Sequence, residues 1–335
     1  MNETEQKPRT VAEKDTLAAY EAEHADQNAT PTASQKSGKL PKSVVAVVVG
    51  CLALNLLMMA TVAVLLAAKW GQERAEKTAT ETTANPHEGE IYIEDGALGG
   101  MWLREYTNVE KSTILTDKIT DDGEFKAYNA GSIPAKTGID VSEYQTVSDW
   151  DAVRASGVQF VMIRAGWRGY EEGVFHEDAS FRDHIEGALA AGLRVGVYFF
   201  SQAVTPGEAR QEANFVLDLI ADYDVTYPVV FDWEAVEGEN ARTYGIQNDQ
   251  LTALAKEFAA VVKANGYTPM LHFYKHLGYL QYDLSQLTDY DYWLAEPGDK
   301  PTFYYRYAMW QYKTDGVVPG VEGTVDLNLC FVPYG

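Results

Sequence analysis

The segment VVFDWEAVEG, residues 229–238, joins an apolar run to two acids at its end. The apolar half is typical of a strand that is covered on both faces, as in a parallel sheet. Side chains at positions i and i+2 of a strand point to the same face, so Asp232 and Glu234 are expected to be neighbours. Because two crowded acids on an inward face are costly to bury, the pair indicates a function rather than packing.

Strand-like and helix-like segments alternate on both sides of this segment from about residue 136 onward. Eight short, largely apolar runs are predicted to be strands: residues 137–144, 158–167, 193–201, 226–234, 268–274, 291–296, 307–312 and 323–328. Four amphipathic stretches with capping residues are predicted to be helices: residues 147–157, 179–192, 205–223 and 247–266. This order predicts an α/β fold, an irregular (β/α) barrel of the TIM-like type, because the later strands have little helix between them.

Four acids are expected at one rim of this barrel. Catalytic groups of such barrels lie at the carboxyl ends of the strands, and we assign Asp140, Asp232, Glu234 and Asp326 to that position. They belong to the first, fourth and last predicted strands. Closure of the sheet is expected to bring them together despite their separation in sequence.

An acidic cluster beside aromatic residues fits glycoside hydrolysis. One carboxyl must keep a proton for the leaving oxygen, while another must be ionised to support the positively charged centre. Crowding separates the two pKa values. Aromatic side chains near predicted strand ends are candidates for stacking on sugar rings: Trp167, Tyr198, Tyr274, Trp293, Trp310 and Tyr312. For each of them, taken singly, core packing is the alternative.

The ordered blocks GIDVSEYQ, FVMIRAGW, GLRVGVYFFS, PVVFDWE and MWQYKTDGVVPGVEGTVDLN resemble the successive motifs of glycoside hydrolase family 25, the Chalaropsis-type lysozymes or N-acetylmuramidases. The resemblance spans roughly residues 136–333. It implies an irregular β/α barrel that cleaves the β-1,4 bond between N-acetylmuramic acid and N-acetylglucosamine in peptidoglycan. It also implies that Glu234 is the general acid, with Asp232 stabilising the transition state or orienting the acetamido group. Asp140 and Asp326 match the remaining active-site acids.

Two segments depart from the family pattern. LHFYKHLG replaces the Tyr-x-Asn segment that relatives tend to show after the fifth strand, and EPGDKP follows the WLA strand in place of a frequent aromatic. These differences affect the contacts expected at the sugar subsites, and they leave the four acids intact.

Other interpretations of the acids remain open. Asp232 and Glu234 can pair with Arg164 or cap loops, and four acids can hold Ca²⁺ or Mg²⁺, although no compact metal-binding loop supports a cation. We therefore expect no metal and no cofactor. His272 and His276 are four residues apart, which suits two ligands of one metal ion only on a helix, whereas a strand end is predicted there. A silent glycan-binding or adhesion module is the alternative function.

Four regions are predicted along the chain. Residues 1–42 have the composition of a disordered tail, and residues 43–68 form an apolar run without charge that is long enough for one transmembrane helix. A cleaved signal peptide is disfavoured because the run is too long and lies too far from the start. Residues 69–133 suit a flexible stalk with short strands near 91–96 and 111–119, and residues 134–335 carry the catalytic domain.

The location of the domain depends on the membrane orientation. Three lysines precede the apolar run, and Lys69, Arg74 and Lys77 follow it, so the positive-inside count is tied. We expect a cytoplasmic N-terminus and an external catalytic domain in a bacterial cell membrane, because the implied substrate is external. The expected partners are the lipid bilayer, through residues 43–68, and the glycan strands of peptidoglycan.

Charge and cysteine content exclude other classes. The formal net charge is −22, and residues 134–335 contain 14 basic against 29 acidic residues, a net charge of −15. Such a surface repels phosphate backbones, so a nucleic acid is not expected as a partner. Cys51 and Cys330 are too few for a disulfide framework, and the domain must be stabilised by its own core.

Overall fold

The computed structural model describes residues 43, 57–75, 85–96, 98–130, 135–236 and 238–335. The chain divides into two units, Met1–Asn85 and Pro86–Gly335, and each is considered by itself. In the first unit, residues 57–75 are helical with exposed side chains. Within the described residues, no helix combines the length and the apolar character that a membrane crossing requires. Half of the predicted span, residues 44–56, lies outside the described residues.

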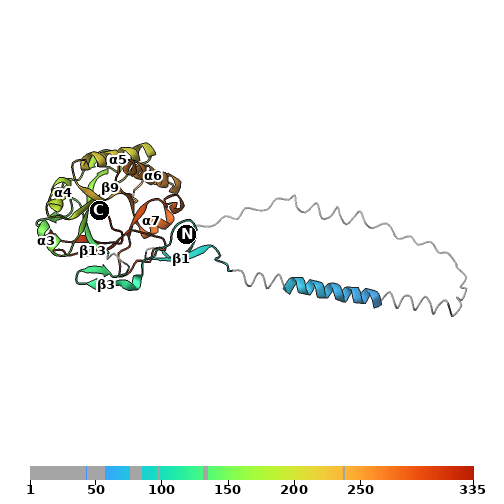
Figure 1. Ribbon diagram of the computed structural model, residues 1–335. Coiled ribbons are helices and arrows are strands. Elements are labelled where there is room, and N and C mark those ends of the chain that lie inside the picture. The colour runs from blue at the N-terminus through green and yellow to red at the C-terminus, as the bar shows by residue number, and fades with distance from the viewer. Residues whose placement is uncertain (1–42, 44–56, 76–84, 97, 131–134, 237) are drawn as a thin grey trace, which may run out of the picture. The chain divides into compact units, whose positions relative to one another are not determined.

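The second unit is built around a closed barrel of eight strands (Figure 1). The barrel strands are β5 (Lys136–Val141), β7 (Phe160–Arg168), β9 (Arg194–Phe200), β10 (Val225–Asp232), β11 (Pro269–Tyr274), β12 (Asp291–Ala295), β13 (Met309–Gly316) and β15 (Val325–Cys330). They follow one another around the barrel in chain order, and pairing of β5 with β7 closes it. All eight predicted strands are present, so the prediction of a barrel is confirmed.

Five helices follow or connect these strands. They are α3 (Trp150–Ala155), α4 (Phe181–Ala190), α5 (Pro206–Ile220), α6 (Asn248–Ala264) and α7 (Lys275–Leu280). The first four match the predicted helices and lie around the outside of the strands (Figure 1). Local sequence explains where two of them begin: Asp149 accepts a hydrogen bond from the Ala152 amide, and Thr205 accepts one from the Glu208 amide just before Pro206.

The short elements complete this unit. They are β6 (Thr146–Val147), which pairs with β14 (Val321–Glu322), β8 (Phe175–Glu177), which pairs with β7, and the 3₁₀ helix η3 (Leu284–Gln286).

The last strand makes the barrel irregular. Six successive pairings from β5 to β13 are parallel, but β15 runs antiparallel to both β13 and β5. A parallel strand needs a long crossover connection, whereas an antiparallel one needs only a short return, which explains why no helix lies between β13 and β15. Asp326 therefore lies at the start of its strand, not at the end as predicted. It still reaches the same rim, because reversal of the strand exchanges its ends.

The barrel interior has two different halves. An apolar cluster fills one half, with Phe160, Met162, Val230, Met270, Trp293 and Met309 among its members. Phe160 packs so closely against β5 that a Cβ on Gly138 would lie 2.2 Å from its ring. Every second side chain of a strand points into the barrel, and near the carboxyl ends of the strands these inward side chains are polar. A larger apolar layer lies between the strands and the outer helices.

Residues before the barrel form an extension that packs on it. Its elements are β1 (Glu90–Asp95), β2 (Gly99–Arg104), the 3₁₀ helix η2 (Thr116–Lys118), β3 (Ile119–Asp122) and β4 (Phe125–Tyr128). Ile91 and Ile93 are buried in the outer core layer, and the Tyr305 hydroxyl accepts a hydrogen bond from the Tyr106 amide at 2.8 Å. The part of the predicted stalk from Pro86 onward thus belongs to the compact unit. Residues 76–84 and 131–134 lie outside the described residues.

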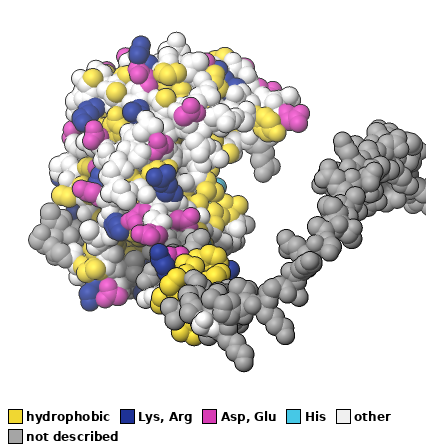
Figure 2. Space-filling view, turned by 90° about the vertical axis from the view of Figure 1, so that its right-hand side faces the viewer, with side chains coloured by type: hydrophobic (Ala, Val, Ile, Leu, Met, Phe, Trp, Pro, Cys, Tyr) yellow, Lys and Arg dark blue, Asp and Glu magenta, His cyan; other side chains and the backbone are white. Residues whose placement is uncertain are grey.

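Charges on the surface are mixed in sign. On the face shown in Figure 2, basic and acidic side chains are interspersed and do not gather into one basic region. On this face, therefore, the described side chains form no basic region of the kind that binds a polyanion.

Candidate active site

The first half of the candidate site is a pair of acids held by side-chain amides. Asp140 and Asp326 lie opposite each other in the antiparallel pairing of β5 and β15. Gln311 Nε2 donates to Asp140 Oδ2 and to Asp326 Oδ2, each at 3.0 Å. Asn328 Nδ2 donates to Asp140 Oδ2 at 2.7 Å, and its own oxygen accepts from Trp293 Nε1 at 2.8 Å. The amides therefore fix both carboxyl groups on the barrel wall.

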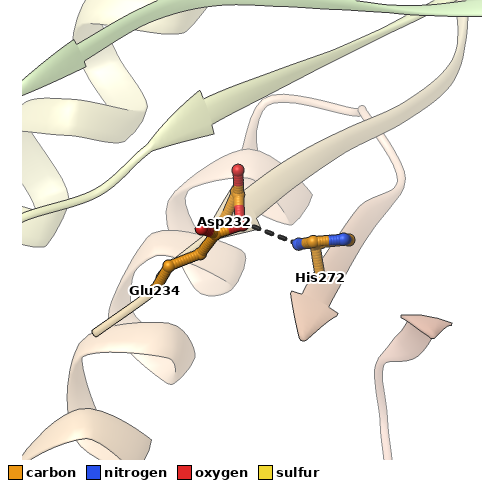
Figure 3. A group of neighbouring side chains, drawn as sticks. All are labelled: Asp232, Glu234 and His272. Atoms are coloured by element: carbon orange, nitrogen blue, oxygen red, sulfur yellow. Dashed lines mark hydrogen bonds and ion pairs between the residues drawn. The ribbon is translucent and has the colours of Figure 1, made fainter. Parts of the chain in front are cut away.

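The second half contains Asp232, Glu234 and His272 (Figure 3). β10 ends at Asp232, which is in register with His272 on β11. The two buried side chains form a hydrogen bond of 2.8 Å between Asp232 Oδ1 and His272 Nδ1. Glu234 lies two residues beyond Asp232, in the loop that follows the strand. The nearest donor atoms of the three side chains lie within 4.8 Å of one another.

Glu234 is held less tightly than the other acids. Among the described residues, its one hydrogen bond is made by the backbone oxygen, which accepts from Gln202 Nε2 at 3.3 Å. Its side chain is half-buried. The carboxyl group is therefore available to an incoming molecule.

The pKa values of these groups are shifted by burial and by one another. Burial, followed by the charge of Asp232, raises the pKa of Glu234 to about 7. Burial, followed by the charge of Asp140, raises the pKa of Asp326 to about 8, and burial likewise raises the pKa of Asp140. Burial alone would lower the pKa of His272, but the neighbouring carboxylates, Asp232 foremost, raise it. Acids that keep protons near neutral pH are thus grouped at one rim.

Three of the six predicted aromatic residues lie at or near this rim. Tyr198 faces Trp293 edge-on at 5.9 Å between ring centroids, and Tyr274 lies 6.0 Å from the ring of His272. Burial, together with the charges of Glu234 and the other acids, raises the pKa of Tyr274. Trp167 is half-buried near the end of β7.

The other three predicted aromatic residues are not positioned to stack on a sugar. Trp293 is 2% exposed and serves as the support of Asn328. Trp310 and Tyr312 belong to the outer core layer. The alternation of β13 explains this position, because Gln311 between them faces the acids. We correct the expectation accordingly: these three side chains do not form an exposed binding surface.

Arg164 does not neutralise the pair of acids, contrary to the alternative considered above. Its Nε donates to Asp178 Oδ2 at 2.7 Å, and its Nη2 lies 3.1 Å from Glu143 Oε1. The guanidinium lies over the rings of Tyr144 and Trp167, at 5.0 and 4.9 Å from their centroids. The negative charge near Glu234 is therefore left without an arginine partner from β7.

Sequence reasoning missed three side chains of the site. The sequence leaves His272 as either incidental or part of a sugar subsite, and it does not single out Gln311 and Asn328. The sequence does indicate that Asn328 faces the site, because it lies two residues after Asp326 in a strand and must point to the same side. His272 and Gln311 become recognisable only when the register of neighbouring strands is known.

A cation is one conceivable occupant of the second half. Asp232, Glu234 and His272 offer two carboxylates and an imidazole, a donor set that suits a transition metal or zinc. However, His272 Nδ1 is already bonded to Asp232. Among the described residues, His272 Nε2 is buried without a hydrogen-bond partner. An acid–imidazole pair beside a carboxyl with a pKa raised to about 7 is also an arrangement that suits acid–base chemistry.

The chain matches a known protein family. Residues 139–321 match the model described as glycosyl hydrolases family 25. The match covers more than half of the chain and includes Asp140, Asp232 and Glu234, whereas Asp326 lies just beyond it.

Two curated proteins are similar in sequence. The autolytic lysozyme of Clostridium acetobutylicum is 29% identical over 192 residues, which cover 57% of this chain and 54% of that protein. Lysozyme M1 of Streptomyces globisporus is 27% identical over 203 residues, which cover 57% of this chain and 66% of that protein. The chain thus spans between half and two thirds of the length of these relatives.

Two solved structures share the fold. The spore cortex lytic enzyme SleM of Clostridium perfringens has a TM-score of 0.52 at 21% identity, covering 60% of this chain and 69% of that one. The modular autolysin LytC from Streptococcus pneumoniae, solved with a synthetic peptidoglycan ligand, has a TM-score of 0.52 at 21% identity, covering 72% of this chain and 56% of that one. At these identities the likeness concerns the fold alone.

Proposed function

The chain belongs to glycosyl hydrolase family 25, and from this premise we propose that it is a peptidoglycan hydrolase. The proposed reaction is cleavage of the β-1,4 bond between N-acetylmuramic acid and N-acetylglucosamine by carboxylate acid–base catalysis. The observation that carries the proposal is a half-buried carboxyl, Glu234, whose pKa is raised to about 7 beside a carboxylate that is bonded to an imidazole. A general acid works best when its pKa is near the working pH.

Glu234 is assigned the role of general acid. At pH 7 about half of its population carries a proton, which it donates to the leaving oxygen of the glycosidic bond. Its loose attachment supports this role, because the carboxyl is free to reach the substrate. As the bond breaks, positive charge develops on the sugar, and a nearby anion stabilises it.

Asp232 is assigned the role of that anion, acting on the sugar directly or through the acetamido group. The hydrogen bond from His272 favours its charged form and fixes its orientation. The nearest Asp232 and Glu234 oxygens lie within 4.8 Å of each other, whereas inverting enzymes keep their carboxyls about 6.5–9.5 Å apart to admit a water.

Asp140 and Asp326 are assigned to substrate positioning on the opposite wall. Their protonated forms can donate hydrogen bonds to sugar oxygens, and the amides of Gln311 and Asn328 keep them in place. Tyr198, Tyr274 and Trp167 are assigned to the sides of the sugar-binding region.

A membrane tether is the second part of the proposal. Residues 43–68 would cross a bacterial cell membrane once, with a cytoplasmic N-terminus and an external catalytic domain. The support is the uncharged run of 26 residues, longer than the roughly 20 that a crossing needs. Protease treatment of intact cells tests it, because external placement exposes Pro86–Gly335 to digestion, whereas a cytoplasmic domain would be protected.

Purified peptidoglycan tests the enzymatic part. Incubation with the full chain is expected to release new reducing ends that terminate in N-acetylmuramic acid. A silent glycan-binding module would instead sediment with the wall and release none. Release of fragments that end in N-acetylglucosamine would keep the hydrolase and reject the assigned bond.

A further inference from the structure

A cavity lies outside the cluster of acids. It has a volume of about 760 Å³ and lies between the β1–β2 hairpin and the barrel. The hairpin contributes Tyr92, Glu94 and Asp95, and the barrel contributes Lys275, Glu296 and Thr302. The volume falls in the range of roughly 300–1,000 Å³ that is typical of ligand sites. The hairpin precedes the residues that match the family.

The cavity opens at the same end of the barrel as the acids. Lys275 directly follows Tyr274, the last residue of β11, and Glu296 directly follows Ala295, the last residue of β12. Both strands run parallel to β10, which ends at Asp232. Lys275 and Glu296 therefore lie at the same rim as the acids, and Tyr274, which precedes Lys275, lies beside His272.

The floor of the cavity is rigid and polar. Lys275 Nζ donates to Glu296 Oε1 at 2.7 Å and to Thr302 Oγ1 at 2.9 Å, and the Thr302 amide donates to Glu296 Oε2 at 2.8 Å. Lys275 and Glu296 are largely buried, with 12% and 11% of their side chains exposed. This ion pair is shielded from solvent and holds the two loops together.

The hairpin presents an aromatic face to this floor. Tyr92 and Trp102 lie opposite each other in the hairpin, with ring centroids 5.2 Å apart, and they remain 52% and 46% exposed. His87 stacks on Trp102 at 3.8 Å. A Cβ on Gly100 would lie 1.9 Å from the Tyr92 hydroxyl, so this ring occupies its place only because residue 100 is glycine.

The hairpin is fixed to the barrel and cannot act as a loose flap. Ile91 and Ile93 on its other face are buried in the core, and the Tyr304 hydroxyl bonds to Glu105 Oε1 at 2.9 Å just after β2. Exposed aromatic rings on a rigid support give binding area at a low cost in conformational entropy.

We propose that the cavity between the β1–β2 hairpin and the β11 and β12 loops is an accessory subsite for an uncharged N-acetylated sugar of the glycan strand. Tyr92 would stack on the sugar ring, and the exposed carboxylate of Glu94 would accept hydrogen bonds from its hydroxyl or acetamido N–H groups. The lining has three carboxylates, Glu94, Asp95 and Glu296, against one lysine, so it repels phosphate polymers and peptide carboxylates. This subsite rests on the proposed function, since it extends the same substrate.

Binding to the Glu234→Gln form of the full chain tests the subsite without turnover. The probes are peptide-free glycan strands in two fractions, long strands and a tetrasaccharide, titrated by calorimetry. Long strands are expected to bind more tightly than the tetrasaccharide. A second change, Tyr92→Ala, should raise the Kd for long strands about tenfold and leave the Kd for the tetrasaccharide unchanged.

Matched variants separate stacking from a general disturbance. Tyr92→Phe keeps the ring and should retain the affinity, whereas Gly100→Ala displaces the ring and should lower it as Tyr92→Ala does. Leu115→Ala alters an exposed apolar residue of the same extension away from the cavity and should have no effect. The subsite is overturned if long strands bind no better than the tetrasaccharide, or if Tyr92→Ala leaves both Kd values unchanged or raises them equally. Reducing-end release by the unaltered chain tests the proposed function separately.

Discussion

The two halves of the acidic rim hold their protons in different ways. Asp140 and Asp326 share the amide of Gln311 and are fixed on neighbouring antiparallel strands, whereas Glu234 lies in a loop and has no such amide. Burial raises the pKa of all three. The difference teaches that a raised pKa by itself does not identify the proton donor. Our proposal assigns the proton donor to Glu234, because among the described residues its carboxyl makes no hydrogen bond, whereas Asp140 and Asp326 accept one or more.

The largest expected effect comes from Glu234. Glu234→Gln removes the transferable proton and keeps the shape, so kcat should fall by roughly 10²–10⁴. Release of reducing ends from peptidoglycan measures it. Glu239→Gln changes an exposed acid of the same loop region and serves as the matched control. A variant at Glu234 that digests walls at the parent rate would show that the proton comes from the other half.

The pH profile sharpens the same distinction. A general acid must be protonated, so kcat/KM should fall as pH rises through about 7, the pKa to which burial raises Glu234. At pH 8 the value should be about tenfold below its plateau. A profile that stays flat to pH 9 would contradict the assignment.

Replacement of His272 tests the role of its hydrogen bond to Asp232, beside Glu234. A charged His272 lowers the pKa of Glu234, so His272→Gln should shift the basic limb of the kcat/KM profile to higher pH. It should also reduce kcat about tenfold, because Asp232 loses the donor that orients it. His276→Gln is the control. An unchanged limb would mean that the imidazole acts only in packing.

Replacement of Asp326, in the pair that Gln311 holds, should change the thermal stability more than the catalytic rate. The pKa of Asp326 is raised to about 8, so the folded chain keeps a proton that the unfolded chain releases, and stability falls as pH rises from about 4 to about 8. Asp326→Asn removes this loss. The free energy of unfolding at pH 8 should therefore rise by on the order of 1–2 kcal/mol after allowance for partial exposure, which raises Tm by a few degrees. Thermal unfolding at pH 5 and pH 8 measures it, with Asp315→Asn as the control. Equal Tm changes at both pH values would contradict the protonated state.

The smallest expected effect is that of a chelator. If Asp232, Glu234 and His272 act as an acid–imidazole group, excess EDTA followed by dialysis should leave the release of reducing ends unchanged. Loss of activity that Zn²⁺ restores would instead assign the donor set to a cation.

Much of the barrel was predictable, because its signals are local. The apolar runs gave the eight strands, and capping residues such as Thr205 gave the helices. The acids were predictable because strand ends meet at one rim. The direction of β15 was not, since an apolar run has no direction, and the outward position of Trp310 depends on a register that a single strand does not reveal. His272 joins the site through its neighbour across the sheet, and such pairing is a property of the closed barrel.

The reversed direction of β15 also determines where the chain leaves the barrel. From Asp326 at the rim with the acids, the strand runs to Cys330, which is paired with Lys136 at the beginning of β5. Gly335 lies beside Arg194, the first residue of β9. A fluorescent reporter or an affinity handle joined after Gly335 would thus emerge on the far side from the glycan. Imaging or immobilising the protein through that end should leave its access to an insoluble wall unobstructed.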